Sequence, residues 1–253
     1  MKIQVLASGS KGNCTFLESK GTRILIDVGI NYNRIKKALE KIDVDPNTIN
    51  GIIISHTHSD HIGGLSSFIK KINTFVFIRE ELYDEIRKII PESNIVIVEE
   101  QSVTIDNLDI KMINASHDVP AFGFIISDGE KRILYLTDTG YINRKYYKEA
   151  ENLDAYIIES NHDERMLMDG PYPYILKQRV ISDKGHLSNR YTGKFLNKTI
   201  GINTKYIVLA HLSENNNTEE LALEQIEDEL KNNSFKTKII IAKQHIETEM
   251  VEI

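Results

Sequence analysis

The sequence has little cysteine and no long apolar run. Its 253 residues include one cysteine, Cys14, which excludes an internal disulfide framework and is typical of a reducing cytosol. No segment approaches the roughly eighteen consecutive apolar residues of a transmembrane helix. The opening MKIQVLASGSKGN has the pattern of a short strand and not of a signal peptide, because its apolar stretch is too brief. We therefore expect a cytoplasmic protein that makes no contact with a membrane.

Negative charge exceeds positive charge over the whole chain, but positive charge is concentrated in one stretch. The formal net charge of −6 argues against a general attraction to polyanions. Residues 165–198, however, contain seven Lys and Arg against two Asp, whereas residues 214–253 contain ten acidic residues against four Lys. Two differently solvated surfaces would explain this division, and so would a local positive field for a polyanionic partner.

The chain also lacks linkers, repeats and low-complexity segments. Blocks of strand-like pattern followed by helix-like pattern occur twice, which predicts a single α/β (α+β) domain over residues 1–253. In it two sheets pack face to face with helices outside. The expected helices include residues 31–41, 62–72, 80–90, 143–150, 173–181, 188–200 and 218–231, and a last strand is expected at 246–252.

The segment SHTHSDHIGG, residues 55–64, is the most informative in the chain. His56, His58, Asp60 and His61 directly follow an apolar strand pattern and lie in an irregular loop, where several side chains can converge on one point. Imidazole and carboxylate groups together suit zinc, manganese or iron better than calcium or magnesium. Four ligand-type residues within six positions favour a metal site over unrelated histidines.

The arrangement H-x-H-x-D-H resembles the signature of the metallo-β-lactamase superfamily. The resemblance implies a four-layer αββα sandwich and further ligands after apolar strands, and the matching residues are His117 in INASHDVPAFGF, Asp138 in ILYLTDTGY and His211 in YIVLAHLSENN. It also implies that Asp27 in RILIDVG supports the metal loop. The full ligand set would be His56, His58 and His117 on one ion, Asp60, His61 and His211 on the other, and Asp138 bridging both.

Two divalent ions are therefore implied, zinc or manganese, with iron possible. Two cations ~3.5–4 Å apart lower the pKa of a bridging water, so that metal-bound hydroxide can attack phosphorus. Glu159 in IIESNHD and His186 in KGHLSNRYTGKFL resemble the proton-shuttling pair of ribonuclease Z, and with Asp60 they are the expected catalytic residues. Alternatively, Glu159 merely ends a strand and His186 caps the next helix with Ser188.

The spacing of the motifs restricts the range of possible substrates. Only 72 residues separate Asp138 from His211, too few for an inserted β-CASP domain. The segments GPYPY and GHLSN resemble the YycJ/WalJ group of bacterial metal-dependent exonucleases, which implies 5′-to-3′ hydrolysis of nucleic acid, DNA rather than RNA. A small-molecule cyclic phosphodiesterase of the PhnP kind is the alternative. A non-catalytic metal-binding scaffold is a weaker one, because a scaffold has no chemical use for seven ligands.

Overall fold

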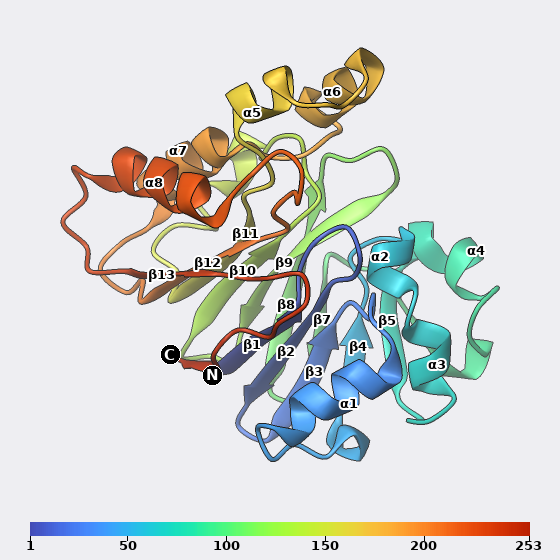
Figure 1. The fold of residues 1–253 in the computed structure, drawn as a ribbon. Coiled ribbons are helices and arrows are strands. Elements are labelled where there is room, and N and C mark those ends of the chain that lie inside the picture. Colours follow the sequence, from blue (N-terminus) through green and yellow to red (C-terminus); the bar gives the residue numbers. More distant parts are fainter. The chain divides into compact units, whose positions relative to one another are not determined.

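The computed structural model describes residues 1–253, which fall into two compact units (Figure 1). The first unit comprises residues 1–112, 127–130 and 243–252, and the second comprises residues 113–126, 131–242 and 253. The single domain expected from the sequence stays a prediction. No helix of the chain is long and apolar enough to cross a membrane.

The first unit contains a seven-stranded sheet of order β14-β1-β2-β3-β4-β5-β6. Its strands are β1 (Lys2–Ala7), β2 (Cys14–Ser19), β3 (Thr22–Ile26), β4 (Gly51–Ile53), β5 (Phe75–Arg79), β6 (Ile95–Val98) and β14 (Val251–Glu252). The strands from β3 to β6 are parallel, and Ile26 of β3 pairs with Ile53 of β4. The residues that follow β3 and β4 therefore leave the sheet at the same edge.

The helices of the first unit are shorter than their sequence patterns predict. They are α1 (Tyr32–Glu40), α2 (Ser59–Ile62), α3 (Leu65–Ile69) and α4 (Tyr83–Ile86), with 3-10 turns η1 (Pro46–Thr48), η2 (Glu80–Leu82) and η3 (Glu92–Asn94). The predicted helix 62–72 is wrong in extent, because Gly63 and Gly64 are poor helix formers and separate α2 from α3. The predicted helix 80–90 is likewise reduced to η2 and α4.

The second sheet has the order β13-β12-β11-β10-β9-β8-β7. Its strands are β7 (Ser102–Ile105), β8 (Leu108–Ala115), β9 (Ala121–Ser127), β10 (Arg132–Leu136), β11 (Ala155–Glu159), β12 (Tyr206–Ala210) and β13 (Lys238–Ile241). β7 and the part of β8 up to Met112 belong to the first unit. The strands from β10 to β13 are parallel, and β11 and the apolar run of β12 are almost wholly buried, as expected of central parallel strands.

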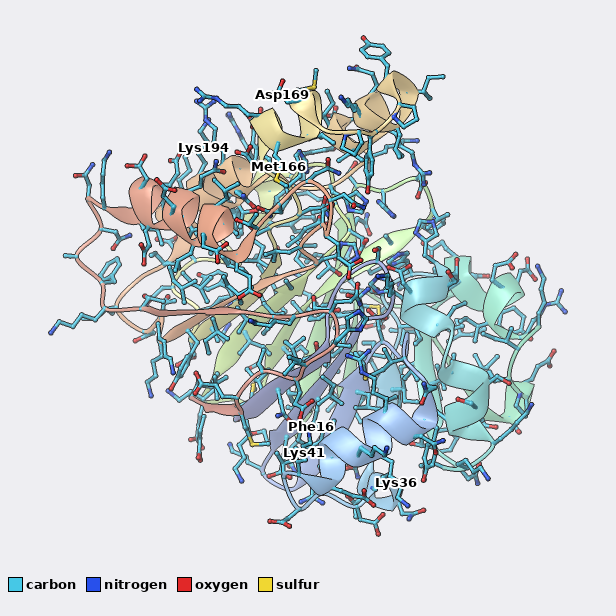
Figure 2. All side chains as sticks on the ribbon, in the orientation of Figure 1. Phe16, Lys36, Lys41, Met166, Asp169 and Lys194 are labelled. Carbon is cyan, nitrogen blue, oxygen red and sulfur yellow. The ribbon has the colours of Figure 1, made fainter.

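Four helices belong to the second unit: α5 (Glu164–Asp169), α6 (Tyr174–Ile181), α7 (Asn189–Thr199) and α8 (Glu219–Leu230). α7 and α8 lie side by side (Figure 1), and Lys194 is labelled on α7 in Figure 2. Phe195 of α7 and Ile226 of α8 join Tyr156 and Ile158 of β11 in one buried core cluster. Apolar side chains at helical spacing thus attach both helices to this unit.

Two predicted elements of the sequence are wrong. The helix expected at 143–150 is only the 3-10 turn η4 (Arg144–Tyr146), which begins where the Asn143 side chain accepts a hydrogen bond from the Lys145 amide. The strand expected at 246–252 is only the two-residue β14. Short alternating or apolar patterns therefore overstated the regular structure in both segments.

Candidate metal centre

The first unit carries the His-rich motif at the end of a buried parallel strand. β4 ends at Ile53, and the chain then turns into the short helix α2. The side chains of His56 and His61 are buried, whereas His58 and Asp60 stay partly exposed. The motif thus combines two buried imidazoles with two partly exposed side chains that could also bind a metal.

Asp27, directly after β3, holds the motif in place. Its Oδ1 accepts a hydrogen bond from the Ser55 amide at 2.7 Å. Its Oδ2 accepts from the Ser55 hydroxyl at 2.7 Å and from His61 Nδ1 at 2.8 Å. Asp27 is fully buried with φ of 59°, a conformation that residues other than glycine rarely adopt. Asp27 thus supports the loop that carries the histidine motif, and the binding of metal by that loop stays a prediction.

Asn13 and Gly29 bring two further segments against the motif. The amide of Asn13 donates to the carbonyl of Asp60 at 2.7 Å, and Asn13 Nδ2 lies 2.9 Å from His61 Nε2. A Cβ atom added to Gly29 would lie 1.7 Å from the Asp60 carbonyl oxygen. Only the short G-N and D-V-G patterns could have pointed to these two residues, and neither pattern is specific.

Three predicted ligands of the second unit lie beyond the ends of its strands. His117 follows β8, Asp138 follows β10 and His211 follows β12. The carboxyl ends of parallel strands meet at one edge of a sheet, where ligands bind in such folds, and His211 Nε2 lies 3.6 Å from Asp138 Oδ1. Asp138 and His211 both have φ of 55°, the kind of backbone strain that clusters at functional sites.

Glu159, the last residue of β11, is fully buried and accepts four hydrogen bonds. Its Oε1 accepts from His186 Nδ1 at 2.7 Å and from His211 Nδ1 at 3.1 Å. Its Oε2 accepts from the backbone amides of Thr139 at 3.0 Å and Leu187 at 3.2 Å. With its lone pairs used in this way, Glu159 positions both histidines and is not itself disposed to bind an ion.

The structure thus brings the predicted pair Glu159 and His186 together. The N-cap of α7 is Ser188 alone, whose hydroxyl oxygen accepts from the Tyr191 amide at 3.3 Å. The side chain of His186 is 23% exposed, whereas those of His117 and His211 are only 3% and 4% exposed. His186 is therefore the imidazole of this group that a substrate can reach.

Burial and charge have opposite effects on the ionisable groups of this unit. Burial opposes ionisation of Glu159, but the His186 charge and its hydrogen bond outweigh it, so that the pKa of Glu159 lies below its usual range. Burial also opposes protonation of His186, yet the Glu159 carboxylate raises the pKa of His186 above its ordinary value. Burial lowers the pKa of His117, which favours the neutral form that ligates metals.

Three of the histidines share an orientation that suits metal binding. The Nδ1 atoms of His56, His117 and His211 each lie 3.0–3.3 Å from a protein oxygen. An imidazole held through Nδ1 presents Nε2 as its ligand atom, as metal-ligating histidines commonly do. Asn161 additionally fixes His211 by donating from Nδ2 to its carbonyl oxygen at 2.8 Å, a contact that the sequence did not reveal.

Within the second unit, ligand atoms of two carboxylates and two histidines lie within 4.8 Å of one another: Asp138, Glu159, His186 and His211. Asp138 and His211 are the predicted ligands among them, and a carboxylate together with an imidazole matches the donor preference of zinc, manganese or iron. The residues present therefore fit a divalent metal. That the four predicted ligands of the first unit and the three of the second share one dinuclear centre stays a prediction.

The basic stretch 165–198 belongs to the second unit and includes His186. Four of its cationic side chains are exposed: Arg165, Lys184, Arg190 and Lys198. Arg190 forms an ion pair with Glu164 at 3.9 Å, and the other three form none. Arg179 instead forms an ion pair with Asp118, the residue next to His117. Positive charge thus lies close in sequence to the accessible histidine.

The predicted strand-end ligands and the histidine motif are those of a class of metal-dependent hydrolases, the β-lactamase superfamily. The chain belongs to the β-lactamase superfamily, because the Beta-lactamase superfamily domain matches residues 22–212. It is 36% identical over 229 residues to exodeoxyribonuclease WalJ of Streptococcus pneumoniae serotype 2 (strain D39), which covers 87% of this chain and 85% of that protein. It is 31% identical over 241 residues to exodeoxyribonuclease YycJ of Bacillus anthracis, with 93% and 91% covered.

A solved structure has the same fold. The metallo-β-lactamase fold protein YhfI from Bacillus subtilis aligns with a TM-score of 0.74 at 17% sequence identity, covering 98% of this chain and 99% of that one. The predicted metallo-β-lactamase type of α/β fold and the resemblance to the YycJ/WalJ group are confirmed. The chain is a hydrolase of a family that binds divalent metal through histidine and aspartate.

Proposed function

We propose that this chain is a dinuclear metal-dependent nuclease that hydrolyses the phosphodiester bonds of DNA from the 5′ end. The observation that carries the proposal is its similarity, over most of its length, to two proteins named exodeoxyribonucleases. The 5′-to-3′ direction is the expectation for the YycJ/WalJ group. The accessible, carboxylate-held His186 supplies the acid–base group that such a reaction uses.

The proposed ligands are seven residues on the two units. His56, His58 and His117 are assigned to one ion, and Asp60, His61 and His211 to the other. Asp138 is assigned to both. Zinc or manganese is the proposed metal, with iron as the further option. When bound, two such ions lower the pKa of water and stabilise the charge that develops on phosphate oxygens.

His186 and Glu159 are proposed as the proton-transfer pair. His186 Nδ1 donates to Glu159 Oε1, which leaves Nε2 to carry a second proton on a side chain that is 23% exposed. The neighbouring carboxylate stabilises that protonated form. Transfer of the Nε2 proton to the departing oxygen is a general-acid step typically worth about 10²–10⁴-fold in rate. Glu159 contributes by orientation and charge and has no contact with the reacting atoms.

The charge around His186 favours a polymer over a small ester. Lys184 lies two residues from His186 and is exposed. Such a cation can neutralise a further phosphate beside the scissile bond, which a small cyclic phosphodiester does not have. The cyclic phosphodiesterase alternative therefore gives no reason for this local charge in a protein of net charge −6.

Hydrolysis assays with metal-loaded protein test the proposal. The substrates are 5′-labelled single- and double-stranded DNA, RNA of the same sequence, and bis(4-nitrophenyl) phosphate. We expect mononucleotide release from the 5′ end of DNA, and its loss in Asp138→Ala. Asp169→Ala is the matched control, because Asp169 is an exposed aspartate at the end of α5 (Figure 2).

The possible outcomes separate the alternatives. Cleavage of the small ester alone would support a small-molecule phosphodiesterase and contradict a nuclease. Absence of any hydrolysis with zinc, manganese and iron would support the scaffold. Equal loss of activity in Asp169→Ala and Asp138→Ala would show that the assay reports folding and not the proposed ligand.

A further inference from the structure

An aromatic cavity of about 460 Å³ lies in the second unit between the 141–147 segment and the start of α7. Its volume is within the common range for small-ligand pockets. The residues that matter here are Tyr141, Arg144, Tyr147, Leu187, Tyr191 and Phe195. None of the predicted metal ligands lines the cavity, and its aromatic residues have no part in the proton transfer described above.

Two of the aromatic rings in the cavity are open to a ligand. Tyr141 is 45% exposed and Tyr191 is 60% exposed, whereas Phe195 is only 2% exposed. The rings of Tyr147 and Phe195 meet edge to face, with centroids 5.1 Å apart and planes at 87°. Phe195 and Tyr147 thus form a packed base, and Tyr141 and Tyr191 leave aromatic surface accessible to a planar group.

The charge of the cavity favours a ligand with a phosphate. Its lining contains Arg144 and no acidic residue. Arg144 is exposed and forms no ion pair in the structure. Lys194 Nζ lies over the Tyr191 ring, 5.4 Å from its centroid, so a second cation accompanies the exposed tyrosine.

A second cavity of the same unit provides a contrast. It measures about 560 Å³ between α5, α7 and α8. Five carboxylates line it against two arginines: Asp163, Glu164, Glu224, Asp228 and Glu229, with Arg165 and Arg190. A polyanion would be repelled there, so the aromatic cavity is the one suited to a nucleotide.

Hydrogen bonds connect the aromatic cavity to the proposed reaction centre. The amide of Leu187 donates to Glu159 Oε2 at 3.2 Å, and the amide of Thr139 donates to the same oxygen at 3.0 Å. The Thr139 hydroxyl donates in turn to the Tyr141 carbonyl at 2.8 Å. Two sides of the cavity are therefore fixed to the carboxylate that holds His186.

We propose that this cavity binds one unpaired nucleobase of the DNA strand, at the nucleotide next to the scissile phosphate. The base stacks on the exposed rings of Tyr141 and Tyr191, and Arg144 contacts an adjacent phosphate. Aromatic stacking accepts every base, so the site positions the strand end without selecting a sequence. This inference rests on the proposed nuclease function, because it identifies the subsite that feeds that reaction.

Binding to an uncut strand provides the first test. Metal-loaded protein is titrated with a single-stranded oligonucleotide whose linkages are phosphorothioates that resist hydrolysis, and whose 5′-terminal nucleotide carries either 2-aminopurine or no base. We expect the 2-aminopurine end to bind about tenfold more tightly than the abasic end, with quenching of its fluorescence. Equal affinity for the two ends, without quenching, would overturn the proposal.

Variants then locate the site. Tyr191→Ala and Tyr141→Ala should each reduce the preference for the base-bearing end about tenfold, whereas Tyr191→Phe should retain it. Phe75→Ala is the matched control, because Phe75 is a 54% exposed aromatic on β5 of the first unit. A preference that survives in both alanine variants would place the base elsewhere and overturn the proposal.

The nuclease function is measured separately with unmodified DNA. Wild-type protein that binds the base-bearing end preferentially but cuts no DNA would contradict the nuclease and leave the subsite supported. Protein that cuts DNA but binds both ends equally would support the nuclease function and contradict the base-binding subsite. The two proposals therefore fail in different measurements.

Discussion

Glu159 serves two histidines with one carboxylate. It holds the partly exposed His186 and the buried His211 through the same oxygen, while two backbone amides fix the other oxygen. A residue in this position controls both a proton donor and a proposed metal ligand. Replacement of Glu159 should therefore lower both the rate of hydrolysis and the metal affinity. Replacement of a purely catalytic residue should lower only the rate.

Replacement of Glu159 by glutamine tests this dual role. Glutamine keeps the size of the side chain but substitutes an amide for one acceptor oxygen, so one set of hydrogen bonds is lost. We expect Glu159→Gln to lower kcat for DNA hydrolysis about 100-fold or more and to weaken metal binding about 10–100-fold. Steady-state kinetics and competition with a chelating dye measure the two effects. Unchanged metal affinity would show that His211 does not depend on Glu159, and Glu227→Gln, an exposed substitution on α8, should change neither value.

His162 should make the folded protein sensitive to acid. It is 2% exposed, and burial lowers its pKa to about 4 from an ordinary value of 6.5. Between these values the unfolded chain binds a proton that the folded chain does not, so stability is retained above about pH 6.5 and falls as the pH drops toward 4. A shift of this size corresponds to about 3 kcal/mol.

Urea unfolding of metal-free protein at pH 7 and at pH 4 measures this effect. We expect the free energy of unfolding to fall about 3 kcal/mol further in wild type than in His162→Gln. Both proteins lose the stability that their carboxylates contribute, so the difference isolates the histidine. Parallel pH profiles would contradict the assignment of a neutral, buried imidazole.

Individual site residues differed in how far the sequence could reveal them. Closely spaced histidines can be recognised directly, and the support that Asp27 gives to the motif followed from the family resemblance. The contacts of Asn13 and Asn161 could not be predicted, because each joins loops 48 or 50 residues apart through a single amide group. No local pattern of residues encodes such a contact.

At the scale of elements, buried parallel strands were the most predictable part of the fold. β11 and β12 are nearly continuous apolar runs, and a residue of the candidate site ends or follows each of them. Short helices were predicted less well. Segment 143–150 holds Tyr146 and Ala150 in the core of the second unit without forming a helix. The sequence could not show this, because apolar spacing alone does not distinguish a helix from a packed turn.

Gly29 links two elements of the first unit and should not tolerate a side chain. An alanine Cβ would lie 1.7 Å from the carbonyl oxygen of Asp60, which is backbone and cannot move aside freely. We expect Gly29→Ala to cost about 2–3 kcal/mol of unfolding free energy and to weaken metal binding. Chemical denaturation and metal titration measure these changes.

Gly21→Ala is the matched control for this substitution. Gly21 has φ of 87° but nothing within 4 Å of an added Cβ, so alanine there should cost about 1 kcal/mol through backbone strain. It should leave metal affinity unchanged. Equal effects of the two substitutions on metal binding would show that the contact of Gly29 with Asp60 does not organise the motif.

At the scale of the whole molecule, the net charge and the proposed substrate have the same sign. A protein of charge −6 repels DNA at long range, so any attraction must come from a local excess of cations. Residues 165–198, which include His186, supply that excess, whereas residues 214–253 carry a net negative charge. Screening by salt weakens the attraction and the repulsion alike, which makes ionic strength an informative variable.

We expect KM for single-stranded DNA to rise about tenfold or more between about 50 and 200 mM salt. The reason is that each neutralised phosphate contributes roughly 0.7 to the slope of log K against log salt concentration. Hydrolysis of a small ester should change less than about twofold. Lys184→Gln should lower the slope by about 0.7, whereas Lys36→Gln on α1 of the first unit (Figure 2) should leave it unchanged. A slope of zero in the wild type would mean that the basic stretch does not contact the strand, and substrate recognition would then have to rest on the aromatic cavity alone.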